Sequence, residues 1–340
     1  MTKWYEKSGK ESDIVVSTRV RFARNLKEFP FECRLKKEDK NKISKLVSNA
    51  ILEGNSLSDR FKVIEIEKVE QAEAVSLVEK HLVSPEFISN KEGRTLLLSD
   101  DEGISIMINE EDHIRIQVMK EGLALDEMYD LIDKIDNLLD EKLSYAFDDK
   151  FGYLTACPTN LGTGMRASLL MHLPALQESG ALNRIAADLS KLGLALRGTY
   201  GEGSSPKGAL YQLSNQISLG ISESEAIKNL NNIALQLATQ ERNARKSMAR
   251  HEEVLDMISR SYGILSNARI LNNEEFMELI SNIRLGVEIG LIKDISYDTI
   301  DSLIVNSQPA TLSYNSKRSL TPAQRDKARA ELVSRTLSKT

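Results

Sequence analysis

The chain has 340 residues, 41% hydrophobic and 28% charged, which is typical of a folded protein long enough for two domains. Its net charge of -5 and the absence of any run of eighteen apolar residues predict no direct nucleic-acid binding and no membrane insertion. The two cysteines, Cys33 and Cys157, form no CxxC pair, which excludes a disulfide framework and a thiolate zinc site and fits a cytoplasmic location.

The first two thirds of the sequence mix strand and helix patterns. Alternating or short apolar runs predict strands over residues 61–69, 95–99, 103–109, 113–119, 152–156, 192–199 and 210–214. Helical spacing predicts helices over residues 40–52, 70–81, 125–143 and 165–173. A polar tetrapeptide, residues 109–112, joins two of the strands as a β-hairpin. The expected fold class is therefore α+β, with an antiparallel β-sheet flanked by helices.

After about residue 220 the pattern becomes mainly helical. Capping signals predict helix starts at three places: the capping box Ser222–Glu225, Asn272 or Asn273, and Thr321 followed by Pro322. Residues 306–319 are polar and predict an exposed linker. We therefore expect an α+β domain over residues 1–225, which the resemblance described below implies to be catalytic, and a helical C-terminal domain over residues 226–340.

Familiar nucleotide-binding motifs are missing. The sequence contains neither the P-loop pattern GxxxxGK[ST] nor the HRD and VAIK motifs of protein kinases. The segment Gly162–Gly164 is by itself more often a plain turn than a phosphate-binding loop. With four histidines and no HExxH motif, we expect no metal bound directly by protein side chains.

Five arginines lie near the ends of predicted elements: Arg19, Arg21, Arg115, Arg166 and Arg197. In a strand, Arg19 and Arg21 share one face. An arginine is permanently cationic and binds phosphate oxygens through two N–H groups, so several can neutralise a nucleotide triphosphate. Each alone is most often a surface charge, but together they indicate a nucleotide site.

Two glutamates lie at positions suited to catalysis. Glu111 is in the predicted hairpin turn, and Glu202 is in a glycine-rich loop that follows a predicted strand. Such loops often display reactive groups. The alternatives for residues 110–113 are a solvated turn or a metal site.

Four segments resemble, in order, the signatures of the ATP:guanidino phosphotransferases, the creatine and arginine kinase family: Ser17–Arg21, Asn109–Arg115, Cys157–Thr163 and Arg197–Glu202. The resemblance covers roughly residues 13–225. It implies the guanidino kinase catalytic fold, which is glutamine-synthetase-like. It also implies ATP as the phosphoryl donor, with Mg²⁺ held through the nucleotide phosphates.

The resemblance also implies roles for individual residues. Glu111 and Glu202 would hold the guanidinium group, and Cys157 would be the reactive cysteine. The alternative for Cys157 is a small buried residue. A lone histidine on an amphipathic helix, such as His81, is a structural core or surface residue as often as it is a functional one. Nucleotide binding is implied for Ser17, Thr18, Arg19, Val20, Arg21, His81, Arg115, Arg166, Ala167, Ser168, Leu169, Leu170, Arg197, Gly198, Thr199, Tyr200 and Gly201.

This arrangement suits the chemistry of a guanidinium acceptor. A protonated guanidinium is a poor nucleophile until a proton leaves as the P–N bond forms. Two carboxylates can bind the cation, aim one nitrogen at the γ-phosphorus and accept the proton. Arginines and magnesium would stabilise charge on the transferring group.

Two features favour an arginine side chain of another protein as the acceptor. The first signature begins at Ser17, which leaves no room before it for the N-terminal helical domain that covers the substrate in metabolite kinases. In addition, Arg325, Asp326, Arg329 and Ala330 resemble a motif of bacterial protein arginine kinases that implies phosphoarginine binding. Taken alone, that motif is most often a solvated helix face.

The resemblance to protein arginine kinases extends from Trp4 to the last predicted helix and implies a stress-response role. It implies protein substrates with exposed arginines, a heat-shock repressor among them, delivery to a Clp unfoldase and a zinc-binding activator protein. It also implies a homo-oligomer, with dimerisation through the C-terminal domain. The alternatives are a free-arginine phosphagen kinase and a non-catalytic phosphoarginine-binding scaffold. A glutamine-synthetase-like ligase would need carboxylate metal clusters that the sequence does not show.

Overall fold

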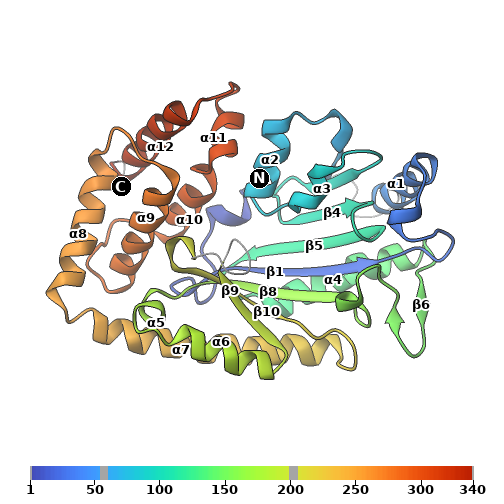
Figure 1. The fold of residues 1–340 in the computed structure, drawn as a ribbon, viewed down its shortest axis with the longest axis horizontal. Coiled ribbons are helices and arrows are strands. Elements are labelled where there is room, and N and C mark those ends of the chain that lie inside the picture. Colours follow the sequence, from blue (N-terminus) through green and yellow to red (C-terminus); the bar gives the residue numbers. More distant parts are fainter. Residues whose placement is uncertain (1, 54–59, 199–205, 339–340) are drawn as a thin grey trace.

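The computed structural model describes residues 2–53, 60–198 and 206–338. Its strands are β1 (Val15–Arg24), β2 (Phe61–Glu65), β3 (Thr95–Ser99), β4 (Ile104–Ile108), β5 (Ile114–Glu121), β6 (Phe147–Asp148), β7 (Gly152–Tyr153), β8 (Met165–His172), β9 (Leu194–Gly198) and β10 (Leu210–Asn215). Eight of them form one antiparallel sheet in the order β2-β3-β4-β5-β1-β8-β10-β9, while β6 and β7 pair separately. The sheet occupies the centre of the molecule (Figure 1).

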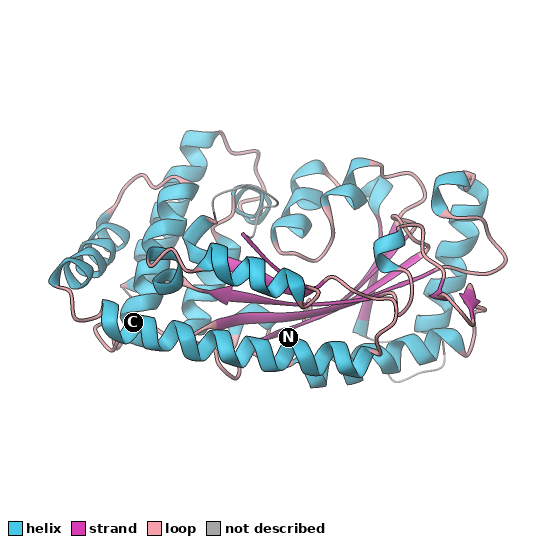
Figure 2. Cartoon of the chain, turned by 60° about the horizontal axis from the view of Figure 1, so that its bottom comes forward, coloured by secondary structure: helices cyan, strands magenta, loops and turns pink. Residues whose placement is uncertain are grey.

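The helices are α1 (Lys37–Leu52), α2 (Gln71–Glu79), α3 (Pro85–Ser89), α4 (Leu125–Asp140), α5 (Pro174–Glu178), α6 (Leu182–Lys191), α7 (Glu223–Met248), α8 (Glu252–Asn267), α9 (Asn273–Glu288), α10 (Tyr297–Asn306), α11 (Pro309–Asn315) and α12 (Pro322–Leu337). Helices α4 and α7 pack on the sheet, and α8 to α12 gather at one end of it (Figure 1). In the view of Figure 2, α7 is the long helix that runs below the sheet. None of the described helices is both long and apolar enough to cross a membrane.

Apolar and polar side chains alternate along the central strands, so the two faces of the sheet differ in polarity. Val20 and Phe22 of β1 belong to the main hydrophobic core, together with Ile132 of α4 and Leu230 of α7. The intervening Arg21, like Arg19, points to the opposite face, because successive side chains of a strand lie on opposite sides. One face of the sheet is therefore buried by helices, and the other carries polar groups.

The predicted α+β fold with an antiparallel sheet is confirmed. The predicted capping residues are also confirmed, since the side chains of Ser222, Asn272 and Thr321 each accept a backbone hydrogen bond at a helix start. The helix predicted over residues 165–173 is wrong, because this segment is strand β8. All of its residues except Arg166 and Leu170 are buried, and two neighbouring strands supply the backbone hydrogen bonds that this segment needs.

The exposed linker predicted over residues 306–319 is also wrong. Residues 309–315 form α11, which packs against α2, and Thr311 is fully buried. The carboxylate of Glu79 accepts hydrogen bonds from the backbone N–H groups of Ala310 (2.8 Å) and Thr311 (2.7 Å). The carboxylate of Glu79 pairs with N–H groups that the start of a helix otherwise leaves without a hydrogen-bond acceptor. Because this capping group is remote in the sequence, the residues around 309 give no capping signal for the helix.

Helix α7 packs with the sheet, although it follows the division expected at residue 225. Ala226, Leu230 and Leu237 belong to the main core. A second core unites α9, α10 and α12, and includes Val16 of β1 and Leu210 of β10. The C-terminal helices are therefore attached to the sheet by shared apolar packing.

Candidate active site

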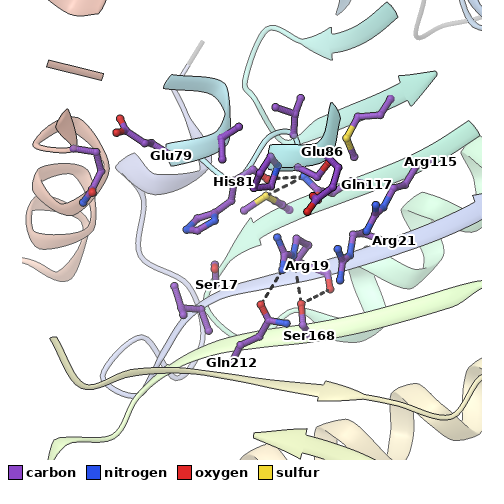
Figure 3. Close-up of a pocket in the computed structure, with 18 of the residues that line it drawn as sticks. Ser17, Arg19, Arg21, Glu79, His81, Glu86, Arg115, Gln117, Ser168 and Gln212 are labelled. Atoms are coloured by element: carbon purple, nitrogen blue, oxygen red, sulfur yellow. Dashed lines mark hydrogen bonds between the residues drawn. The ribbon is translucent and has the colours of Figure 1, made fainter. Parts of the chain in front are cut away.

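A cavity of about 620 Å³ lies over the polar face of the sheet (Figure 3). Its walls come from residues 78–86, at the end of α2 and the start of α3, and from the starts of α9 and α11. Its floor consists of side chains that alternate along three central strands: Ser17, Arg19 and Arg21 of β1, Arg115, Gln117 and Met119 of β5, and Ser168 and Leu170 of β8.

The arginines of the floor are held in place by neighbouring polar side chains. Arg19 donates to Gln212 Oε1 (2.9 Å) and to Ser168 Oγ (3.4 Å). Arg115 donates to Glu110 Oε1 at 2.8 Å. Arg166 pairs with Arg21 across β1 and β8, so the cations of the two strands are neighbours.

This cluster of cations is short of negative charge. Burial, together with Arg115 and Arg166, lowers the pKa of Arg19 to about 10. Burial and the neighbouring arginines also lower the pKa of Arg21 well below its usual range. An arginine keeps its proton near neutral pH, so these cations remain charged. The lowered pKa values mean that burial and mutual repulsion make the charged forms less stable than in water. The Nε atoms of Arg21 and Arg166 are buried without a hydrogen-bond partner among the described residues. A polyanion such as a nucleotide triphosphate fits this arrangement.

Next to the cations, the β4–β5 hairpin brings Glu111 and Cys157 together. Asp112 accepts hydrogen bonds from Asn25 Nδ2 (2.6 Å) and from the backbone N–H of Ala156 (2.7 Å), which ties the hairpin to the segment that carries Cys157. Cys157 lies near the Glu111 carboxylate and acts to lower its pKa. Burial, followed by the charge of Asp112, raises the pKa of Glu111, against the opposing effect of Arg115. Such a carboxylate is suited to accept a proton.

The sequence did not single out three residues that shape this site. Glu110 is buried, binds Arg115, and also accepts a hydrogen bond from Ser84 Oγ (2.8 Å). Gln212 and Gln117 line the cavity from β10 and β5. Both glutamines lie in predicted strands, on the polar face, so the alternation of side chains could have placed them near the site. Nothing else in the sequence distinguishes them from ordinary surface residues.

Several residues predicted to bind nucleotide lie elsewhere. Val20, Ala167 and Leu169 are fully buried in the core on the opposite face. Thr18 is also buried, and its hydroxyl donates to the backbone oxygen of Gly122 at 2.6 Å. Strand alternation turns these four side chains away from the cavity, and the nucleotide-binding role implied for them stays a prediction.

The loop after β9 is only partly described. Arg197 is exposed on β9, directly opposite Gln212, and its charge contributes to the lowered pKa of Arg166. Gly198 ends the strand. The predicted site residues Thr199, Tyr200, Gly201 and Glu202 lie outside the described residues, so the pairing of Glu111 with Glu202 stays a prediction.

His81 lies at the cavity wall immediately after α2, in the left-handed backbone region with φ 60°. Its backbone oxygen accepts a hydrogen bond from Gln117 Nε2 at 2.8 Å. Burial and then the charge of Arg19 lower the pKa of His81 to about 4. The ring is therefore neutral near pH 7.

The pH dependence of stability tests the environment of His81. Its folded pKa lies below the ordinary value of 6.5, so the stability it contributes is present above about pH 6.5 and is lost as the pH falls towards 4. That loss is at most about 3 kcal/mol. We expect His81→Asn, which suits a positive φ, to lose less unfolding free energy than the wild type between about pH 7 and about pH 4.5 in urea titrations. Parallel losses in the two proteins would contradict this assignment.

The C-terminal motif is partly buried. Arg329 is 1% exposed, and its guanidinium donates to the backbone oxygens of Ser307 (2.9 Å) and Leu271 (2.8 Å) and to Asp326 Oδ1 (2.8 Å). Ala330 packs in the second core, and Arg325 is half-buried. Arg329 thus connects α12 to the C-terminal end of α10, and phosphoarginine binding by this motif stays a prediction.

Comparisons with known proteins agree with this geometry. The family model described as "ATP:guanido phosphotransferase, C-terminal catalytic domain" matches residues 42–244, and "Protein-arginine kinase McsB C-terminal domain" matches residues 251–340. The two matches meet at the end of α7. A protein-arginine kinase of Caldanaerobacter subterraneus subsp. tengcongensis is 44% identical over 332 residues, which cover 97% of this chain and 98% of that protein.

Solved structures of guanidino kinases have the same fold. The duplicated taurocyamine kinase from Schistosoma mansoni, with bound transition-state analog components, matches with a TM-score of 0.61 and 29% identity, over 67% of this chain and 33% of that one. A lombricine kinase matches with a TM-score of 0.61 and 23% identity, over 70% of each chain. With its arginine-lined cavity, its hairpin glutamate and these relatives, the chain belongs to the ATP:guanido phosphotransferase family and, within it, to the protein-arginine kinases.

Proposed function

We propose that this chain transfers the γ-phosphoryl group of ATP to arginine side chains of proteins. The observation that carries the proposal is the cluster of Arg19, Arg21, Arg115 and Arg166 beside the hairpin that carries Glu111. The cations match a triphosphate, and the carboxylate matches a guanidinium acceptor. The arginine acceptor itself is inferred from the names of the relatives that match nearly the whole chain.

The residues have distinct tasks in the proposed reaction. The arginines bind the phosphates and stabilise charge as the bond between the γ-phosphorus and the β–γ bridging oxygen breaks. Glu111 and, by resemblance, Glu202 hold the acceptor guanidinium, and one of them takes its proton as the P–N bond forms. Magnesium would enter with the nucleotide and neutralise phosphate charge. ADP leaves with the electron pair of the broken bond.

The position of Cys157 near Glu111, where the thiol acts to lower the pKa of the carboxylate, suggests how the cysteine assists. A thiol there can donate to the carboxylate and help to fix its orientation, and Thr159 Oγ1 lies 3.1 Å from the sulfur. We propose that Cys157 positions Glu111 and adjusts its pKa. It does not need to form a covalent bond for this role.

We further propose that the product marks proteins for a Clp unfoldase and inactivates a heat-shock repressor, with a zinc-binding activator and self-association as controls. Membership of the protein-arginine kinases and the motif from Arg325 to Ala330 support this wider role. Degradation of a denatured substrate by a Clp unfoldase and protease, with and without prior phosphorylation by this chain, tests it. Equal degradation rates would refute the marking role.

The acceptor can be identified directly. We expect the chain, incubated with ATP and a denatured protein, to form acid-labile phosphate that mass spectrometry locates on arginine side chains. Free arginine in place of the protein should give little product. Transfer to free arginine alone would instead identify a phosphagen kinase, and binding of phosphoarginine without any transfer would identify a scaffold.

A further inference from the structure

The register of the central strands orients the nucleotide in the cavity. Arg24 pairs with Ile114, which immediately follows the hairpin of Glu111, whereas Ser17 pairs with Leu170 at the far end of β1. The strand between Arg24 and Ser17 spans about 23 Å. Because the γ-phosphoryl group must face Glu111, the nucleoside has to lie towards Ser17. In Figure 3, Glu79 and His81 lie at the side of the cavity opposite to Arg115.

The C-terminal helices cover this nucleoside end. Asn273 at the start of α9, together with Gln308 and Pro309 at the start of α11, lines the same cavity as the arginines. A smaller cavity of about 30 Å³ continues from there and is also lined by His81, Leu170 and Gln308. The site is therefore built from both parts of the chain.

The polar groups at this end suit a nucleobase or ribose. Asn273 Nδ2 donates to Gln308 Oε1 at 3.4 Å, and Gln308 Nε2 donates to the backbone oxygen of Ile304 at 2.8 Å. Asn273 Oδ1 is buried and has no hydrogen-bond partner among the described residues. Carboxamides pair well with the amino group and ring nitrogens of adenine. The apolar side chains of Leu170, Met119 and Pro309 in the same cavity can contact the faces of the ring.

One carboxylate of the catalytic part fixes this wall. Glu79 lines the cavity, and its Oε2 accepts hydrogen bonds from the backbone N–H (2.7 Å) and the hydroxyl (2.9 Å) of Thr311. Its Oε1 accepts from the backbone N–H of Ala310 at 2.8 Å. These three bonds hold the start of α11, which carries Gln308 and Pro309, against the end of α2. Glu79 is also two residues before His81 in the chain.

We propose that the C-terminal domain forms the nucleoside-binding end of the ATP site through Gln308 and Asn273, and that Glu79 is the positioning residue for this wall. The inference rests on the proposed function, because it assumes that ATP occupies the cavity. Its consequence is that the helical domain contributes to ATP affinity directly. The phosphate end is lined by the arginines of the sheet.

Two probes separate the ends of the site. Calorimetric titration of the full chain with ATP reports both ends, whereas inorganic tripolyphosphate reports the arginine end alone. We expect Gln308→Ala, Asn273→Ala and Glu79→Ala each to raise the Kd for ATP about tenfold, the usual effect of losing a hydrogen bond in a binding site. The Kd for tripolyphosphate should not change. Arg21→Met should weaken the binding of both probes.

The matched control is Ser296→Ala. Ser296 caps α10 in the same domain by accepting a hydrogen bond from the N–H of Thr299, and it does not line the cavity. Its loss should therefore leave both dissociation constants unchanged. If Glu79→Ala does not fold, Glu79→Gln, which keeps one acceptor oxygen, should still give a weaker and ATP-specific effect.

Two results would overturn the inference. The first is an unchanged Kd for ATP in folded Gln308→Ala and Asn273→Ala proteins. The second is an equal weakening of ATP and tripolyphosphate binding, which would indicate a general disturbance of the fold. A wild-type chain that binds neither probe would instead refute the proposed function, so the two failures are distinguishable.

Discussion

Replacement of Glu111 by glutamine is expected to lower kcat about a thousandfold and to leave the Kd for ATP nearly unchanged. A glutamine keeps the size of the side chain but can neither attract the acceptor guanidinium by charge nor accept its proton. The cations that bind the phosphates come from β1, β5 and β8 and remain in place. Steady-state kinetics with a denatured protein substrate, together with calorimetric titration of ATP, measures the two effects separately.

The neighbouring Glu110 provides a control for the loss of one negative charge from the same hairpin. Its carboxylate is buried, and its Oε1 accepts hydrogen bonds from both Arg115 and Ser84, so we expect burial to keep it from a substrate. We expect Glu110→Gln to affect mainly the position of Arg115 and the thermal stability, with a much smaller loss of kcat. Equal losses of kcat in the two variants, or an active Glu111→Gln protein, would remove Glu111 from the proposed mechanism.

Replacement of Arg21 by methionine is expected to change activity and stability in opposite directions. The value of kcat/KM should fall about a thousandfold or more, because a cation next to the transferring phosphoryl group is lost. The melting temperature without nucleotide should rise by about 2 to 4 °C, because repulsion among Arg19, Arg21, Arg115 and Arg166 is relieved. Thermal unfolding with and without ATP, combined with kinetics, tests both.

The exposed Arg260 serves as a control for the removal of one arginine. It forms a surface ion pair with Asp256 one helical turn away, and pairs of this kind contribute little to stability. Arg260→Met should therefore leave both activity and melting temperature close to the wild-type values. If Arg21→Met lowers the melting temperature without affecting activity, Arg21 serves the fold and has no part in binding phosphate.

The alternation of side chains along a strand explains why much of the site could be predicted from single residues. Arg19 and Arg21 are two positions apart in a segment that forms a strand, so their side chains had to share one face. The same rule would have excluded Val20 and Thr18, which the resemblance to the guanidino kinases had implied as part of a continuous binding segment. A motif names a stretch of chain, whereas strand geometry decides which of its side chains reach a ligand.

The sequence by itself determined the family, the antiparallel α+β fold, the principal cations and the hairpin glutamate, because these depend on local patterns and on motifs. Only the tertiary structure decided how distant segments meet. Glu79 caps α11 across 231 positions of the chain, Asp112 ties the hairpin to the segment of Cys157, and Gln308 covers the nucleoside end of the cavity. Hydrogen bonds of this kind join donors and acceptors that are far apart in the sequence. The local pattern of residues therefore cannot predict which donor and acceptor will pair.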